Sequence, residues 1–311
     1  MAKKTLDQLL KSYSPRHSGR LRTLVSRELG RPFSAWVPYK PGESKVLNFI
    51  RKWALGRLKA VWIIVLFPLM AAVVGKSVLK GNNLGVESVS SVSALLVVLT
   101  VVGFGSIGLT TAGVSDEWKV LARESSWGVR GWQHILSKFL GSVPPTIVLG
   151  VLTAWFFCLL VETDTTMVHE NNFAFLAIML VLYSWCCTAM GLAVSSVVRG
   201  TKSTVLVLMA TLAMFVVLSE IPIPLDNLEG WAGDVLKLIS LVIPARWAGG
   251  AWAAQIDLES LNPYDEHGFT WEPTFETALI DCSGLLICMV AYLVIASIMV
   301  RSRAPKILLN Q

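Results

Sequence analysis

The stretch that decides the fold runs from Ser106 to Leu160 and reads SIGLTTAGVSDEWKVLARESSWGVRGWQHILSKFLGSVPPTIVLGVLTAWFFCLL. An apolar run ends at its start, and a short segment rich in charged residues follows. A second apolar run begins near Ile135 and lasts through Leu160. The pattern predicts two membrane spans joined by a structured, charged loop.

The charged loop has the periodicity of a helix over residues 114–125. Its apolar residues share one face of such a helix: Val114, Trp118, Leu121 and Ala122. Its charged residues lie on another face, at i, i+3 and i+7: Asp116, Lys119 and Arg123. We expect the first face to lie against the membrane and the second to press on a partner.

The composition places the chain among membrane proteins. Of its 311 residues, 54% are hydrophobic and only 15% are charged, and the mean hydropathy is +0.60. A soluble domain of this size carries about 25% charged residues. We therefore expect an all-α, polytopic membrane protein.

Basic residues gather before the first span. About half of all Lys and Arg residues lie within the first sixty positions, which predicts an uncleaved cytoplasmic region over residues 1–59. Two amphipathic helices are expected in it, near residues 21–31 and 46–54, both in the membrane interface. A plain positive anchor and a role in transmitting movement fit equally well. A nucleic-acid-binding tail fits poorly, because the basic residues are interleaved with an apolar stripe.

Hydropathy and charge predict six membrane spans. They cover about residues 60–78, 88–109, 135–160, 173–198, 204–219 and 278–300. The acidic region 220–276 is expected outside, as a re-entrant loop with Trp247 and Trp252 at headgroup level. The basic tail 301–311 is expected in the cytoplasm with the N-terminus.

The sequence holds no catalytic or metal-ligand constellation that we recognise. The four His residues lie in four different segments, and the five Cys residues all fall within predicted spans. Asp281 is the only carboxylate that we place inside a span, and we expect it to face solvent near the outer end. Residues 200–204 resemble the end of a phosphate-binding loop, but Lys202 does not directly follow Gly200. We therefore expect a chain that is not an enzyme by itself and binds no cofactor.

The segment from Asp116 to Pro145 resembles the loop after the second span in ABC exporter permeases of the type-2, G-subfamily-like class. Matching parts of this loop are Arg123-Glu124, Gly128-Val129-Arg130 and Lys138-Phe139-Leu140 with Pro144. Upstream, TLVSRELGRP resembles the connecting helix of that class, although Gly30-Arg31-Pro32 lacks the Asp of the family pattern. The residues IPIPLDNL and LISLVIPARWAGGAW resemble its re-entrant outer loop.

This resemblance implies a permease subunit that works by alternating access. ATP and Mg would be bound by a separate ABC ATPase subunit, and a second permease copy, identical or paralogous, would complete the path among the membrane lipids. Residues expected to couple the chain to the ATPase are Asp116, Glu117, Lys119, Arg123, Glu124, Arg27 and Arg31. Residues expected to line the substrate path are Phe104, Met209, Leu212 and Phe215. An apolar path suits a hydrophobic, lipidic or peptide-like substrate, and the resemblance implies export across the plasma membrane of a bacterium.

Other functions remain open from the sequence. The first alternative is a membrane scaffold or sensor subunit that transports nothing and anchors a cytoplasmic partner. A membrane enzyme acting on lipid is a weaker alternative, because no catalytic constellation is visible. Within transport, a polysaccharide exporter is also possible, although the Trp-rich region before the last span fits the G-like class better.

Overall fold

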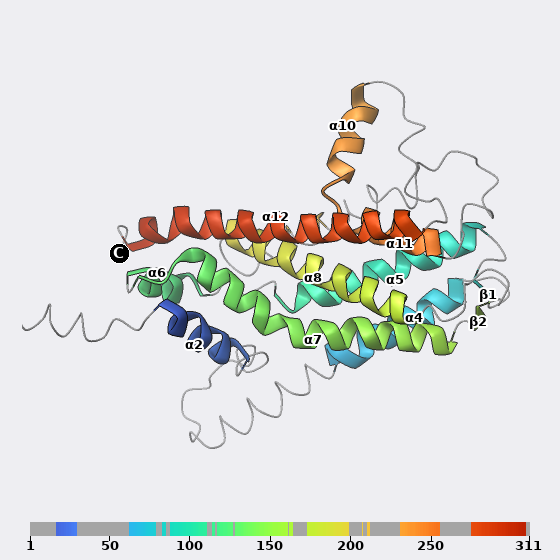
Figure 1. Cartoon of the computed structure of the whole chain (residues 1–311), viewed down its shortest axis with the longest axis horizontal. Helices are drawn as coiled ribbons and strands as arrows, with labels where there is room; N and C mark the ends of the chain where they lie inside the picture. The colour runs from blue at the N-terminus through green and yellow to red at the C-terminus, as the bar shows by residue number, and fades with distance from the viewer. Residues whose placement is uncertain are drawn as a thin grey trace, which may run out of the picture.

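The computed structural model is an elongated bundle of long helices (Figure 1). It describes residues 17–29, 62–78, 83–84, 88–110, 114–115, 117–126, 128–160, 162–163, 173–198, 207, 210–211, 231–255 and 275–308. Its helices are α2 (His17–Leu29), the π-helical turn η2 (Trp62–Leu66), α4 (Phe67–Val78), α5 (Ser88–Gly108), α6 (Trp118–Ser126), α7 (Gly131–Leu160), α8 (Phe173–Val197), α10 (Trp231–Ser240), α11 (Pro244–Gln255) and α12 (Phe275–Leu308). Two parallel strands of two residues each, β1 (Asn83–Leu84) and β2 (Glu162–Thr163), join the loops after α4 and α7.

Three described helices are long and apolar enough to cross a membrane: α7, α8 and residues 275–303 of α12. Two shorter apolar helices lie within α4 and α5. The fifth predicted span, 204–219, lies outside the described residues except for three helical positions, 207, 210 and 211. The chain is therefore a multi-pass helical protein, and the total of six spans stays a prediction.

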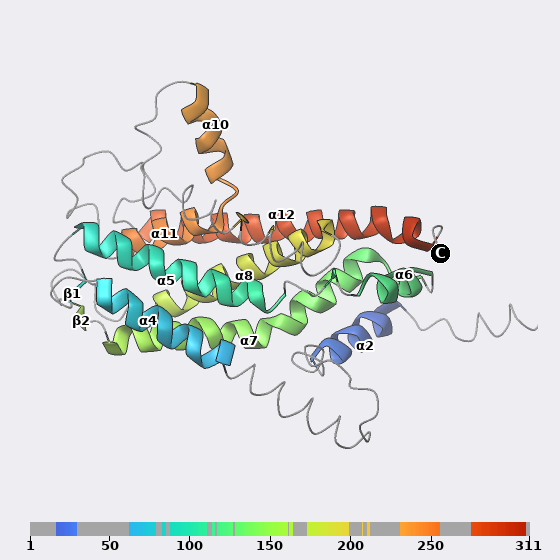
Figure 2. The same cartoon turned by 180° about the vertical axis from the view of Figure 1, so that it is seen from behind.

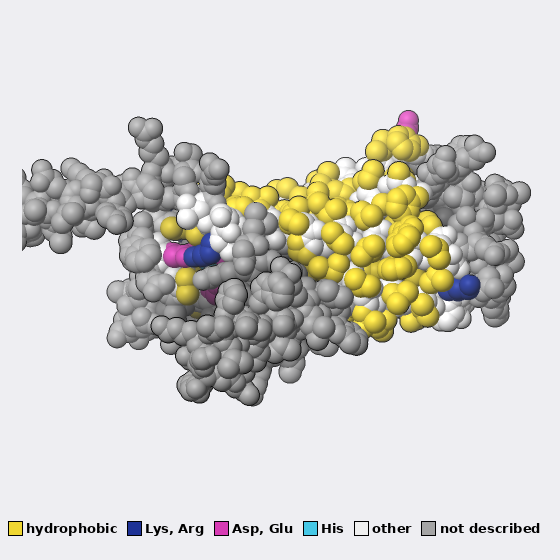
Figure 3. All heavy atoms as spheres, turned by 90° about the horizontal axis from the view of Figure 1, so that it is seen from below, with side chains coloured by type: hydrophobic (Ala, Val, Ile, Leu, Met, Phe, Trp, Pro, Cys, Tyr) yellow, Lys and Arg dark blue, Asp and Glu magenta, His cyan; other side chains and the backbone are white. Residues whose placement is uncertain are grey.

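The two ends of the bundle differ in character. Figures 1 and 2 place α2, α6, the start of α7 and the end of α12 together at one end, which we call the charged end. The strands β1 and β2 and the start of α12 lie at the opposite end. Between the ends, Figure 3 shows a broad surface of hydrophobic side chains on the face it presents. Such a surface suits the hydrocarbon layer of a bilayer.

Helix α7 passes through Pro144 and Pro145 without a break. Figure 1 shows that α7 changes direction along its length. Proline cannot donate a backbone hydrogen bond to the preceding turn, so a bend is the expected consequence. The same helix is thus able to connect the charged end to the membrane core.

Small residues allow the helices to approach closely. A β-carbon added at Gly103 of α5 would lie 2.8 Å from the hydroxyl of Tyr183 on α8, and that hydroxyl donates a hydrogen bond to the carbonyl of Leu99. A β-carbon at Gly150 of α7 would lie 2.9 Å from the backbone nitrogen of Val181. The α5–α8 and α7–α8 contacts therefore need glycine.

The structure shows burial in α11 and α12 that the sequence did not predict. Trp252 of α11 is buried in the core, where its ring packs edge-on against Phe157 at 5.1 Å between centroids. Asp281 of α12 is fully buried and does not face solvent. The reason is the same for both: α11 packs into the bundle against α5, α8 and α12 and covers the start of α12.

Candidate functional site

The apolar face of α6 is buried by the bundle. Val114, Trp118 and Leu121 form a core cluster with residues of three helices: Ile135 and Phe139 of α7, Ala189, Leu192 and Ala193 of α8, and Ala296 and Val300 of α12. The expectation that this face lies against the membrane is therefore wrong. It lies against helix ends, so α6 contacts α7, α8 and α12 at once.

Backbone hydrogen bonds fix both ends of the α6 loop. Before the helix, the backbone nitrogens of Val114 and Ser115 donate to Oγ of Ser195 on α8, at 3.1 and 3.0 Å. After it, Gly128 adopts a positive φ of 82°, a conformation that glycine adopts without strain. The nitrogen of Val129 then donates to the carbonyl of Glu124 at 3.1 Å and closes the turn into α7.

Arg27 of α2 and Glu124 of α6 form an ion pair at the charged end. Nη1 of Arg27 donates to Oε1 of Glu124, and Nδ1 of His134 on α7 donates to Oε2 of the same carboxylate at 3.2 Å. The Glu124 side chain is only 8% exposed. This carboxylate therefore joins three helices within the chain.

A second ion-pair centre lies beside the first. Nζ of Lys138 on α7 lies 2.9 Å from Oε2 of Glu117, just before α6, and 3.6 Å from Oε2 of Glu28 on α2. Glu28 also accepts a bond from Nη2 of Arg27 at 3.1 Å. The pairs connect into one network, which we call the α2–α6–α7 network: Arg27, Glu28, Glu117, Glu124, His134 and Lys138.

The surroundings hold the Glu124 carboxyl in its charged form. Burial alone would raise its pKa, but the hydrogen bonds from His134 and Arg27 and the charge of Arg27 lower the pKa to about 2. Partial burial likewise opposes the charge on Arg27, yet Glu124 and Glu28 raise the pKa of this guanidinium above its ordinary value. The pair is therefore ionised throughout the physiological pH range.

A close backbone contact supports the network. Helix α2 packs on α7 with Glu28 over Gly141: a β-carbon at Gly141 would lie 2.8 Å from Cβ of Glu28 and 3.8 Å from its Cα. Only glycine leaves room for α2 at this distance. The contact brings Glu28 within reach of Lys138, one turn earlier on α7.

The structure brings three of the expected coupling residues together: Arg27, Glu117 and Glu124. Lys119 and Arg123 lie on α6, but their side chains are not described, and Asp116 and Arg31 lie outside the described residues. Of the expected path residues, Phe104 is half-buried on α5 and packs against the core, whereas Met209, Leu212 and Phe215 are not described.

Sequence reasoning did not select Glu28, His134 and Lys138 as site residues. A signal was available in α7: His134 and Lys138 lie four residues apart, on one face of a predicted apolar helix. Ionisable residues on such a helix are costly unless they are paired. Among the described residues, no cluster of His, Cys, Asp or Glu is suited to hold a metal ion.

A family model described as ABC-2 type transporter matches residues 43–252 of the chain. This chain belongs to the ABC-2 type transporter family. The match includes α6, the start of α7 and therefore Glu117, Glu124, His134 and Lys138. No curated protein matches the chain.

Membership fixes the general role of this ABC-2 protein. It is a transmembrane permease subunit of an ABC transporter, it acts with an ABC ATPase, and its membrane domain has no ATPase activity itself. Helices α2 and α12 lie outside the matched residues, so Arg27 and Glu28 extend the site beyond the family match.

Proposed function

We propose that this permease exports a hydrophobic, lipidic or peptide-like substrate across a bacterial plasma membrane, driven by ATP that a separate subunit hydrolyses. Two permease copies, identical or paralogous, would enclose the path between them. The observation that supports the proposal is the α2–α6–α7 network, because it connects two short helices, α2 and α6, to α7, which is long and apolar enough to cross a membrane.

The proposed mechanism starts at α6. ATP binding closes the ATPase subunits, which push on α6 and on α2. Because Glu124 is bonded to both α2 and α7, and the apolar face of α6 packs on α7, α8 and α12, the push moves these elements as one body. The spans then change their packing and the path opens to the other side.

The proposed substrate class rests on the apolar character of the residues expected along the path. Phe104 on α5 is the described member of that path, and it packs against the core. An apolar path binds apolar parts of a substrate and offers little to a sugar polymer. The direction of transport and the inward position of the charged end are part of the proposal.

The test uses the full chain purified in mild detergent with its bound proteins identified by mass spectrometry. We expect a stoichiometric ABC ATPase and, after reconstitution into vesicles, ATP-dependent movement of a fluorescent phospholipid or a fluorescent hydrophobic peptide. A chain that purifies with a non-ATPase partner and moves neither probe contradicts the exporter and favours the scaffold or sensor function.

A further inference from the structure

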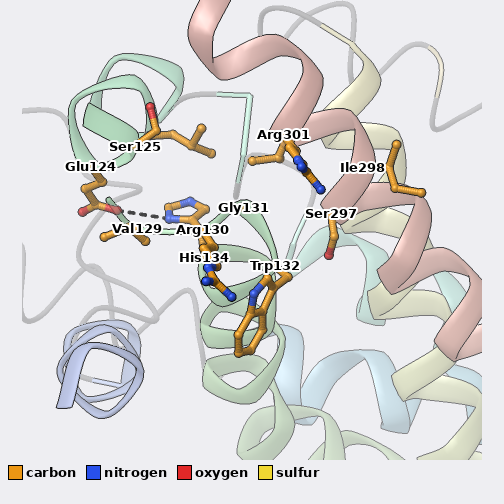
Figure 4. Close-up of a pocket in the computed structure, with 12 residues that line it drawn as sticks. Glu124, Ser125, Val129, Arg130, Gly131, Trp132, His134, Ser297, Ile298 and Arg301 are labelled. Carbon is orange, nitrogen blue, oxygen red and sulfur yellow. Dashed lines mark hydrogen bonds and ion pairs between the residues drawn. The ribbon is translucent and has the colours of Figure 1, made fainter. Parts of the chain in front are cut away.

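A cavity of about 610 Å³ opens at the charged end, between the α6–α7 turn and the last turns of α12 (Figure 4). Much of its wall is apolar, with Leu121 and Val129 on one side and Ile298 and Val300 on the other. Arg130 and Arg301 line it as well. The cavity thus combines two cations with an apolar wall.

The two arginines are available to a ligand. Both are exposed, and neither guanidinium has an ion pair within the part of the chain that the structure describes. Figure 4 shows them on different elements, Arg130 directly before α7 and Arg301 on α12. Arginine keeps its charge at all physiological pH values and binds phosphate through two parallel hydrogen bonds.

The acidic side chain beside the cavity does not oppose an anion strongly. Glu124 lines the cavity, but its two oxygens are bonded to Arg27 and His134. Helix α7 begins at Gly131, also in the lining, and the start of a 30-residue helix favours negative charge. The local electrostatics therefore suit an anion.

The surface next to the cavity points to a lipid. On α12, exposed apolar side chains follow one face at helical spacing, and Arg301 continues the same face: Ile287, Val290, Val294, Ile298 and then Arg301. Trp132, 44% exposed, lies at the same level on α7. An apolar stripe that ends in a cation beside an interfacial Trp matches acyl chains below a charged headgroup.

We propose that this cavity binds the headgroup of an anionic phospholipid, with the phosphate between Arg130 and Arg301 and an acyl chain along the α12 stripe. The site adjoins Glu124, so an occupied cavity stabilises the packing of α12 against the α6–α7 turn. Lipid would then modulate the same unit that the ATPase moves. This modulation rests on the proposed function, whereas the binding itself does not.

The test is native mass spectrometry of the full chain in detergent, titrated with phosphatidylglycerol or with phosphatidylcholine of the same acyl chains. The variants are Arg130→Gln, Arg301→Gln and the pair together, and the control is Lys76→Gln, which removes a cation at the opposite end. A further titration adds glycerol 3-phosphate to compete with phosphatidylglycerol for the cavity. Elution volume and thermal unfolding check that each variant folds; both arginines are exposed, so folding is expected to persist.

We expect the wild type to bind phosphatidylglycerol more tightly than phosphatidylcholine. Each single variant should weaken phosphatidylglycerol binding about tenfold, the loss of one charge-assisted contact, and Lys76→Gln should leave it unchanged. Equal binding by the wild type and the double variant would overturn the proposal. Displacement by glycerol 3-phosphate at comparable concentration would overturn the lipid assignment in favour of a small phosphate. If the double variant loses a co-purified protein but binds lipid as the wild type does, the proposal is overturned and the arginines contact that protein instead.

Discussion

The guanidinium of Arg27 on α2 is bonded to the carboxylate of Glu124 on α6, 97 positions later in the chain. From the family resemblance, Glu124 was expected to be among the residues on which the ATPase acts. Its side chain is instead largely buried and bonded within the chain. Its role in the proposed coupling is therefore to hold α2, α6 and α7 together under load.

Breaking the pair should release α2. We predict that Arg27→Gln and Glu124→Gln each weaken the packing of α2 by about 1–3 kcal/mol, because each leaves a partly buried charge without its partner. A double-mutant cycle should give a coupling of about 0.5–3 kcal/mol. Hydrogen exchange of the α2 amides measures the effect, and Ser26→Ala, exposed on the same helix, is the control. Additive effects would show that the two side chains do not interact.

The pair should resist moderate acid. The Glu124 carboxyl has a pKa of about 2 in the folded chain and an ordinary value of 4.5. A lowered folded-state pKa stabilises the fold above the ordinary value, and this stability is lost as pH falls from about 4.5 toward 2. Protection of the α2 amides, corrected for the intrinsic exchange rate, should be equal at pH 7 and about pH 5.5 and lower at about pH 3. If the protection of the α2 amides were already lost at pH 5.5, the low pKa of the Glu124 carboxyl would be contradicted.

The glycine contact gives a prediction that does not involve charge. Gly141→Ala places a methyl group 2.8 Å from Cβ of Glu28, so α2 has to move away from α7. We expect a destabilisation of α2 packing of about 1–3 kcal/mol, typical of overpacking. Gly108→Ala is the matched control, because nothing lies within 4 Å of its added methyl group. Hydrogen exchange of the α2 amides measures the effect. Equal exchange in the Gly141→Ala and Gly108→Ala variants would mean that α2 does not pack at Gly141.

The buried carboxylate of α12 gives another test. Neither oxygen of Asp281 has a hydrogen-bond partner among the described residues. An unpartnered charge in an apolar interior is costly, so Asp281→Asn should leave the thermal stability unchanged or raise it. The measurement is thermal unfolding in detergent, with Ser283→Ala, exposed on the same helix, as control. A marked loss of stability in Asp281→Asn would reveal a partner for the carboxylate.

The sequence predicted the helices well and their contacts less well. Apolar runs set the bounds of α5, α7 and α8 to within a few residues, because a membrane helix needs about 20 apolar residues. The burial of Trp252 and Asp281 could not be predicted in this way. It depends on α11 folding into the bundle, which is a tertiary contact that local hydropathy does not encode.

The site shows the same division. The residue pattern of the α6 loop and its family resemblance selected a candidate segment with its charged members, including Glu117 and Glu124. It could not show that Glu124 points to Arg27 and His134, since the three positions come together only when α2 packs on α7. The spacing of His134 and Lys138 marks one face of α7, but it does not show that their partners come from α2 and α6.

The most direct test of the account follows ATP-driven movement without knowledge of the substrate. The complex with its ATPase is reconstituted in lipid nanodiscs, and hydrogen exchange of α5, α8 and α12 is measured with and without ATP for the wild type and Glu124→Ala. We predict that ATP changes exchange in these helices in the wild type, and that Glu124→Ala keeps its ATPase but loses this change. An ATP-dependent change of the same size in Glu124→Ala would contradict the claim that the α2–α6–α7 network carries movement into the membrane.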